Sequence, residues 1–96
     1  MKRAQWSTRA VQDLKAARRF LQSERPDAAA SILENIVRST DRLLEAPAIG
    51  SPVGYRRWRK WRVRGTPYLL FYQPDPIGIT VVHILHQRSD WWSVMR

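Results

Sequence analysis

A dense cluster of positive charge and indole lies between Gly54 and Gly65, where the chain reads GYRRWRKWRVRG. Six of the nine residues in 56–64 are Arg or Lys, and two are Trp. Arg and Lys can hold phosphate groups, and indole rings can stack on bases. The same side chains also suit contact with an acidic protein. The pattern indicates a nucleic-acid or acidic-protein partner, with a solvated strand face over Trp packed in the core as the alternative.

A β-strand over residues 55–63 would direct these side chains to opposite faces, because successive side chains alternate. One face would carry Arg57, Arg59 and Trp61. The other face would carry Arg56, Trp58, Lys60 and Arg62. The two tryptophans fall in opposite phases, so we expect either a β-bulge between them or a strand that is covered on both faces.

Two histidines lie in the last aliphatic run, ITVVHILH (79–86), and Arg88 follows it. A His beside an Arg can act as a general acid next to a phosphate clamp. The alternative is a partly buried His that is hydrogen-bonded to the backbone. Strand alternation predicts that His86 shares a face with Val82, and that His83 shares the other face with Val81.

Other kinds of catalytic centre find little support in the sequence. Only Asp75 and Asp90 lie in the C-terminal half, and no pair of carboxylates is visible, which disfavours a glycosidase or a two-metal nuclease. There is no cysteine, and no third ligand stands at a suitable spacing from the histidines. No glycine motif for a phosphate is present. We therefore expect no metal and no cofactor.

Length and charge limit the number of domains and the kinds of partner that the protein can have. The 96 residues suffice for one small domain, 1–96, with one core. Seventeen Lys and Arg against eight Asp and Glu give a net charge of +9, which favours polyanionic partners. No apolar run reaches the roughly 20 residues of a membrane span, and the start, MKRAQWSTRA, lacks the apolar region of a secretory signal. We expect a cytoplasmic protein without a membrane partner.

The first half of the sequence predicts two helices. Apolar residues recur at helical spacing from Ala10 to Leu21, after a candidate N-cap at Ser7 or Thr8. A wider apolar stripe follows Pro26, which suits a first helical turn, and ends before Pro47. Two helices with a short joint read as an antiparallel hairpin.

The second half predicts strands. The candidates are residues 55–63, 68–73 and 79–86, after a loop over 46–54 that holds two Pro and two Gly. Tight connections predict a three-stranded antiparallel meander, with residues 1–6 as either an additional edge strand or a frayed end. The predicted class is α+β, with the helix hairpin packed on one face of this small sheet and a short helical tail over 88–96.

Four stretches together resemble a known family: DLKAARRF (13–20), ILENIVRSTDRLLEAPAIGSP (32–52), RVRGTPYLLFYQPD (62–75) and VVHILHQRSDW (81–91). The aliphatic strand followed by Leu-His-x-Arg-x-Asp is the most specific of them. This combination resembles the ParE/RelE superfamily of toxins from type II toxin–antitoxin systems.

The resemblance implies a bacterial toxin that is neutralised by a small antitoxin with an acidic C-terminal segment. Operator DNA would be bound only through the antitoxin. An inert member that binds only its antitoxin and operator is a further alternative. The residues expected to contact the antitoxin are Val11, Leu14, Arg18, Leu21, Arg56 and Trp58.

Two target classes exist in this superfamily. ParE-like toxins poison DNA gyrase without being enzymes, and the His-x-Arg-x-Asp ending resembles them. The residues expected to contact this target are Arg57, Arg59, Lys60, Arg62, Arg88, Trp91 and Trp92, with Asp90 beside them in the tail.

RelE-like toxins instead cut mRNA in the ribosome without a metal, usually with a Tyr near the C-terminus. Arg88 matches their arginine after the last strand, but no Tyr follows it. If the chain is such an endoribonuclease, His86 would be the proton donor or acceptor. The phosphate would then be held by Arg88, Lys60 and Arg62.

Overall fold

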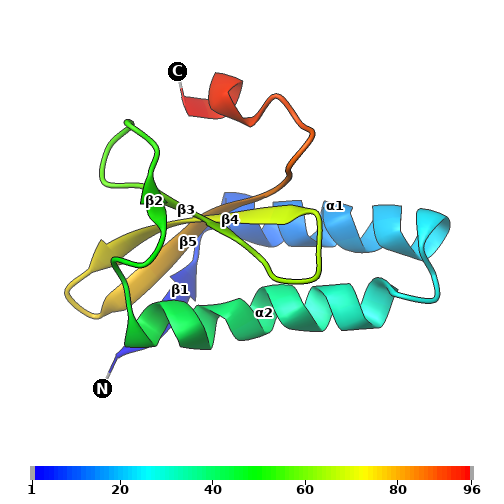
Figure 1. Cartoon of the computed structure of the whole chain (residues 1–96), viewed down its shortest axis with the longest axis horizontal. Coiled ribbons are helices and arrows are strands. Elements are labelled where there is room, and N and C mark those ends of the chain that lie inside the picture. The colour runs from blue at the N-terminus through cyan, green and yellow to red at the C-terminus, as the bar shows by residue number, and fades with distance from the viewer. Residues whose placement is uncertain (1, 96) are drawn as a thin grey trace.

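Two helices and a five-stranded mixed sheet make up this computed structural model, which describes residues 2–95 (Figure 1). The elements in chain order are β1 (Arg3–Trp6), α1 (Thr8–Glu24), α2 (Ala29–Glu45), β2 (Ser51–Pro52), β3 (Arg59–Arg62), β4 (Tyr68–Asp75), β5 (Gly78–His86) and the 3₁₀ helix η1 (Trp91–Met95). The predicted α+β class is confirmed. Met1, the first residue of the predicted segment 1–6, and Arg96, the last residue of the predicted tail 88–96, lie outside the described residues.

The strand order is β1-β5-β4-β3-β2. β3, β4 and β5 form the predicted antiparallel meander. Of the two options predicted for residues 1–6, the edge strand is the one observed: β1 runs parallel to β5 with Arg3 opposite Gly78. A side chain at Gly78 would clash with the carbonyl oxygen of Arg3, so this close pairing requires glycine. β2 pairs with β3 inside the predicted loop, so the sheet is larger than expected.

The helices follow the predicted pattern, with one shifted boundary. Ser7 caps α1, because its hydroxyl accepts a hydrogen bond from the backbone N–H of Ala10 at 3.0 Å. α2 begins at Ala29 and not at Pro26. The residues before it form a turn that is closed by the Ala28 N–H donating to the Arg25 carbonyl at 3.0 Å.

The predicted strand over 55–63 is too long. β3 covers only Arg59–Arg62, and the chain before it makes a turn in which Arg56 has a φ of 53°. No bulge separates the two tryptophans. Their opposite phases are explained by the other predicted option, because Trp61 and Trp58 pack against cores on opposite faces of the sheet.

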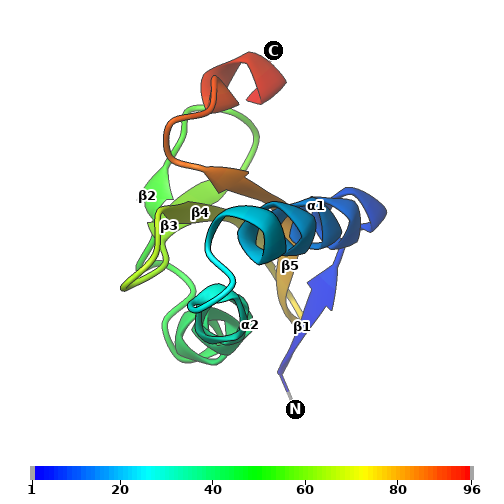
Figure 2. The ribbon, with the colours of Figure 1, turned by 90° about the vertical axis from the view of Figure 1, so that its right-hand side faces the viewer.

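We call these two sides of the sheet the helix face and the tail face. On the helix face, α1 and α2 bury the main core, which includes Leu21, Ile36, Leu70 and Tyr72. On the tail face, η1 and the turn before β3 cover a smaller cluster around Leu69, Phe71 and Met95. Figure 2 shows the C-terminal segment and α2 on opposite sides of the strands.

A β-bulge does occur, but in β5. Phe71 pairs with His83 while Tyr72 pairs with Val81, so Val82 is the extra residue. Val82 and His83 therefore both lie toward the tail face, whereas Val81 lies toward the helix face. The predicted grouping of His86 with Val82, and of His83 with Val81, is wrong for this reason.

No helix among residues 2–95 combines the length and the hydropathy that a membrane crossing needs.

Candidate functional site

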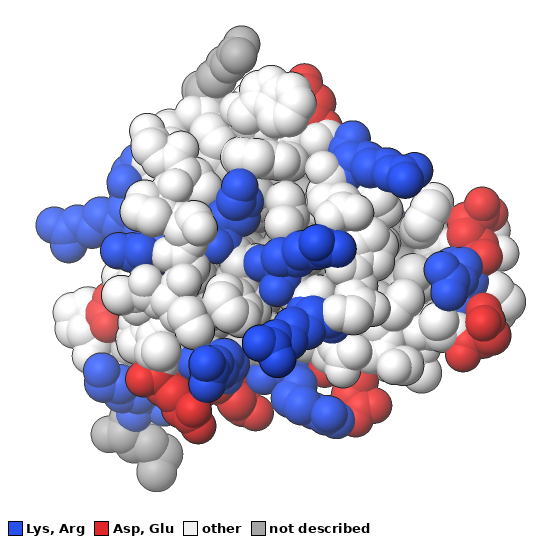
Figure 3. All heavy atoms as spheres, viewed as in Figure 1, with Lys and Arg blue, Asp and Glu red and all other residues white. Residues whose placement is uncertain are grey.

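The cations of residues 51–95 lack carboxylate partners among the residues that the structure describes. Within residues 2–95, the Arg–carboxylate ion pairs are those of Arg9, Arg25 and Arg38, all in the helical half. The cations of residues 56–64 and Arg88 form none there. Figure 3 shows Lys and Arg in a band across the middle of one face, with acidic side chains mainly at its margins. The band is an attractive surface for a polyanion.

Arg59 is the exception within the predicted target-contact set. Its Nη1 donates to the carbonyl oxygens of Gly50 at 2.6 Å and Ala48 at 3.2 Å. The neighbouring Tyr72 hydroxyl donates to the Pro47 carbonyl at 2.7 Å and accepts from the Gly50 N–H at 2.9 Å. Arg59 therefore fixes the loop after α2 to the sheet and is half-buried, which leaves less of its guanidinium group accessible for the predicted contact with the target.

Burial changes the acidity of the Tyr72 hydroxyl. Desolvation raises the pKa of the Tyr72 hydroxyl above its ordinary value, although the Gly50 hydrogen bond and the positive charge of Arg59 both act to lower it. The hydroxyl thus stays neutral and keeps its donor role to the Pro47 carbonyl.

A basic aromatic patch forms on the tail face where η1 docks. The Lys60 ammonium lies 4.5 Å from the centroid of the Trp91 ring, and that ring packs 5.5 Å from Phe71. Trp92 makes an edge contact with Trp91 at 5.7 Å and is half exposed. Arg62 lies on the same face, because it pairs with Leu69 of the tail-face cluster. We call Lys60, Arg62, Trp91 and Trp92 the tail patch.

The turn before β3 carries a second basic surface. Arg56 and Arg57 border an open groove of about 350 Å³, which Trp58 also lines. The Arg56 guanidinium lies 5.2 Å from the centroid of the Tyr55 ring. A left-handed backbone at a residue other than glycine costs about 1 kcal/mol. The turn accepts this cost at Arg56 and leaves two guanidinium groups exposed.

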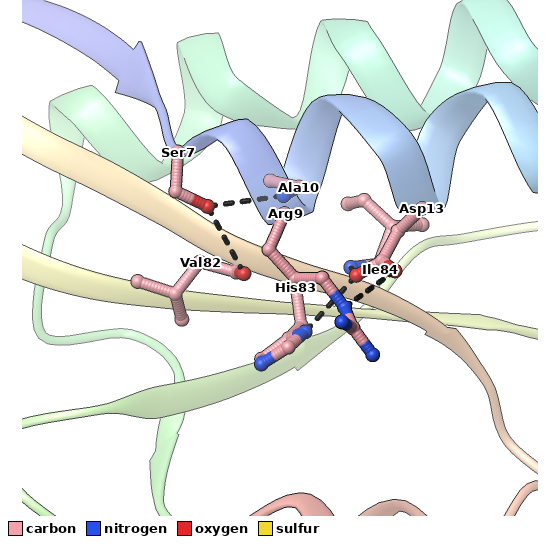
Figure 4. A network of polar contacts seen from close by, with 7 residues as sticks. All are labelled: Ser7, Arg9, Ala10, Asp13, Val82, His83 and Ile84. Atoms are coloured by element: carbon pink, nitrogen blue, oxygen red, sulfur yellow. Dashed lines mark hydrogen bonds and ion pairs between the residues drawn. The ribbon is translucent and has the colours of Figure 1, made fainter.

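α1 covers the edge of β5 beyond the end of β1 through a polar network (Figure 4). The Ser7 hydroxyl donates to the Val82 carbonyl at 3.2 Å. The Ile84 N–H donates to Asp13 Oδ2 at 3.1 Å, and the same oxygen lies 3.0 Å from His83 Nδ1. His83 is buried, and its partner is this carboxylate and not the backbone group that was the predicted alternative. No pattern in the sequence indicated that Asp13 would contact His83.

His86 and the tail patch lie on opposite faces. His86 pairs with Tyr68, a residue of the helix-face core, and the two rings meet edge to face at 5.5 Å. The Nδ1 atom of His86 accepts a hydrogen bond from the Arg88 N–H at 3.0 Å. Lys60 and Arg62 project from the tail face, so the four residues assigned to a nuclease do not converge on one site.

The predicted antitoxin contacts divide into accessible and buried residues. Leu21 is 2% exposed and belongs to the helix-face core, so its assignment to a surface contact is wrong. Leu14 is half-buried against that core. Val11 and Arg18 are exposed on α1. The remaining two, Arg56 and Trp58, belong to the turn before β3.

The part of the chain that the structure describes contains no group of three His, Asp or Glu side chains arranged to hold a metal ion. The tail patch and the arginine-rich turn combine positive charge with exposed aromatic surface.

Known proteins share this architecture. The chain of the chromosomal ParDE system from P. aeruginosa has a TM-score of 0.77 at 19% identity, with 90% of this chain and 96% of that chain covered. The isolated E. coli RelE toxin has a TM-score of 0.66 at 18% identity, with 98% and 94% covered. The intact E. coli RelBE complex matches with 0.64 at 17% identity over 88% and 94%. At such identities the likeness shows the fold.

Sequence comparison identifies the family within this shared fold. A protein of Sinorhizobium fredii with the name "Putative toxin Y4kP" is 28% identical over 94 residues, which cover 98% of this chain and 97% of that protein. The family model described as ParE toxin of type II toxin–antitoxin system, parDE, matches residues 4–91. Since that match runs from β1 to the first residue of η1, the chain belongs to the family of ParE toxins of type II toxin–antitoxin systems.

Proposed function

We propose that the chain is a ParE-like inhibitor of DNA gyrase, which a small acidic antitoxin neutralises in the bacterial cytoplasm. The observation that carries the proposal is the separation of His86 from the tail patch. The patch consists of cationic and indole side chains and contains neither a His nor a carboxylate that could act as a general acid or base. Such a surface acts by binding.

The tail patch has the composition of a protein-binding hot spot. Trp and Arg dominate binding energy at interfaces, and the half-exposed Trp92 contacts Trp91, the ring over which the Lys60 ammonium lies. Fixed cations also speed association with an acidic protein surface. The proposed contacts with gyrase are Arg57, Lys60, Arg62, Arg88, Trp91 and Trp92.

Purified gyrase with supercoiling as the readout tests this function. The free chain should stop supercoiling and accumulate cleaved DNA. The variants Arg62→Glu and Trp92→Ala should each be weaker inhibitors by about tenfold or more, the usual loss at a hot spot. Arg19→Glu, an equal charge change on the exposed side of α1, is the matched control. Normal supercoiling at doses that arrest growth would contradict the proposal.

Ribosome-dependent mRNA cleavage is the second candidate, and one observation favours it. Lys60 and Arg62 lie on the same strand and face without a carboxylate partner in the described chain, as residues that hold a scissile phosphate would. Primer extension on translated mRNA distinguishes the two. Cleavage that His86→Ala and Arg62→Ala abolish would replace the gyrase proposal with this one.

A further inference from the structure

A basic groove that none of the predicted contact residues lines lies between α2 and the turn that follows β3. Its volume is about 310 Å³, and it is open to solvent on one side. The half-buried Trp61 and the buried Val63 form its apolar floor. The polar side chains that line it are Asn35, Arg38, Ser39, Arg42 and Arg64. We call these seven residues the α2–β3 groove.

The positive charge of the groove is largely uncompensated. Arg38 has an ion pair with Glu34 one turn earlier on α2, but both side chains are about two-thirds exposed, so the pair is weak. Arg42 and Arg64 are exposed and have no carboxylate partner among residues 2–95. An anion in the groove would therefore meet three guanidinium groups, whose planar forks match the oxygens of a phosphate.

The α2 wall also offers a polar group that can recognise a ligand. Helical spacing places Asn35, Ser39 and Arg42 on one side of α2. The Ser39 hydroxyl is engaged, because it donates to the Asn35 carbonyl at 3.0 Å. The side-chain amide of Asn35 forms no hydrogen bond within residues 2–95. An amide both donates and accepts, so it can pair with the edge of a heterocyclic base.

The opposite wall is the turn after β3, which carries Arg64. The Thr66 hydroxyl closes this turn by donating to the Val63 carbonyl at 3.0 Å. Gly65 has a φ of 73°, and a Cβ at this glycine would lie 3.8 Å from the amide nitrogen of Asn35. The amide therefore lies beside the turn. Both walls are fixed by backbone structure before a ligand arrives, which lowers the ordering cost of binding.

We propose that the α2–β3 groove binds a nucleoside polyphosphate. The base stacks on the Trp61 indole and forms hydrogen bonds with the Asn35 amide. The phosphates contact Arg42 and Arg64, with Arg38 at the rim. The inference goes beyond the proposed inhibition of gyrase and does not depend on it.

Size and composition favour a single nucleotide over other anions. The volume of about 310 Å³ lies at the lower end of the roughly 300 to 1,000 Å³ that is usual for small-ligand sites. The groove contains one indole, which offers one stacking surface, whereas single-stranded nucleic acids are held by successive rings. Inorganic phosphate would leave the indole and the Asn35 amide without a role.

Fluorescence anisotropy with the purified full chain tests the site. The probe is ATP that carries a fluorescent label on its ribose. Arg42→Glu combined with Arg64→Glu should weaken its binding by about tenfold or more, because charge-assisted contacts with the phosphates are lost. Arg18→Glu combined with Arg19→Glu makes the same charge change on α1 and should weaken binding by less than about threefold. All four arginines are exposed, so circular dichroism should be the same for wild type and both variants.

Competition separates the contribution of the base from that of the phosphates. Unlabelled ATP should displace the probe at a concentration about fivefold or more below that of inorganic triphosphate, because only ATP has a base to stack. Trp61→Leu keeps an apolar side chain without a ring and should remove this advantage of ATP. Trp61→Phe keeps a ring and should retain most of it.

Nuclear magnetic resonance of the wild-type chain supplies a second readout. The indole N–H resonances of Trp61 and Trp92 are identified by their absence from the spectra of Trp61→Phe and Trp92→Phe. ATP should shift the Trp61 resonance and leave that of Trp92 unchanged, although Trp92 is the more accessible of the two at 52% exposed.

Four results would overturn the site. They are equal weakening by the α1 variant, inorganic triphosphate that competes as well as ATP, a Trp61 resonance that ATP does not shift, and oligodeoxythymidine that binds through Arg42 and Arg64 more tightly than ATP does. The last of these would assign the groove to a nucleic acid chain and not to a free nucleotide.

Discussion

The two faces of the sheet differ in how much they bury. Among residues 2–95 the helix-face core has fourteen buried residues, whereas the tail-face cluster has three, with partly exposed aromatics around them. The helix face is covered by two long helices, and the tail face by a five-residue 3₁₀ helix and a turn. Stability therefore resides mainly on the helix face, whereas the tail face carries accessible charged and indole side chains.

A matched pair in β4 gives the sharpest test of this difference. Leu70 is fully buried on the helix face, and its neighbour Leu69 is 7% exposed on the tail face. Leu70→Ala should lower the free energy of unfolding by about 4 kcal/mol, and Leu69→Ala by about 2 kcal/mol, because the thinner cover can relax around the cavity. Urea unfolding measures both. Equal losses would contradict the comparison.

The next largest effect is expected at Tyr72. Tyr72→Phe removes the hydrogen bond to the Pro47 carbonyl and leaves the buried Gly50 N–H without its acceptor. The free energy of unfolding should fall by about 2 kcal/mol. The control is the same substitution on the tail face, Tyr55→Phe, which should change the free energy of unfolding by less than about 0.5 kcal/mol.

Tyr72 also predicts a pH dependence. Its pKa is raised in the folded state, mainly by burial, so the folded protein holds the phenolic proton more tightly than the unfolded chain does. The corresponding stability is complete below the ordinary pKa of about 10 and is lost as the pH rises through the folded value. Urea unfolding at about pH 8 and about pH 11 should show a smaller alkaline loss in Tyr72→Phe than in wild type. Tyr68, whose pKa burial also raises, accounts for a remaining loss.

The polar network at the β5 edge should contribute less. Asp13→Ala leaves the Ile84 N–H without an acceptor and should cost about 1 to 2 kcal/mol in urea unfolding. Asp13→Asn keeps an acceptor oxygen and should recover most of that loss. Arg9→Ala removes only the exposed partner of the carboxylate, and its effect should stay below about 0.5 kcal/mol.

The smallest effect on stability is expected in the tail patch. Arg62→Glu changes an exposed side chain without an internal partner among the described residues, so the free energy of unfolding should move by less than about 0.5 kcal/mol. Gyrase inhibition by the same variant should nevertheless weaken by about tenfold or more. A variant that unfolds more easily and inhibits normally would reverse the assignment of the two faces.

Periodic features of the sequence predicted most of the fold. Helical spacing predicted both helices, and turn residues predicted the meander. β2 has only two residues, too few for any period to appear. The bulge at Val82 could not be found either, because ITVVHILH is apolar on both faces and has no alternation to interrupt.

The site was harder to predict than the fold. Composition located the basic cluster, but it could not tell that Arg59 bonds to the carbonyl oxygens of a distant loop. Asp13 and His83 are 70 positions apart, and their contact depends on how α1 crosses β5. Leu21 shares the helical spacing of the exposed Val11 and the half-buried Leu14 along α1, and only its burial in the helix-face core distinguishes it.

The pairing of β1 with β5 has a consequence for synthesis. Ser7 bonds to Val82, 75 positions later, so the first strand has no neighbour until the last one has left the ribosome. Contacts between such distant segments form slowly. The complete sheet therefore cannot form until β5 has been synthesised, although β3 and β4, which follow one another in the sequence, can pair before that.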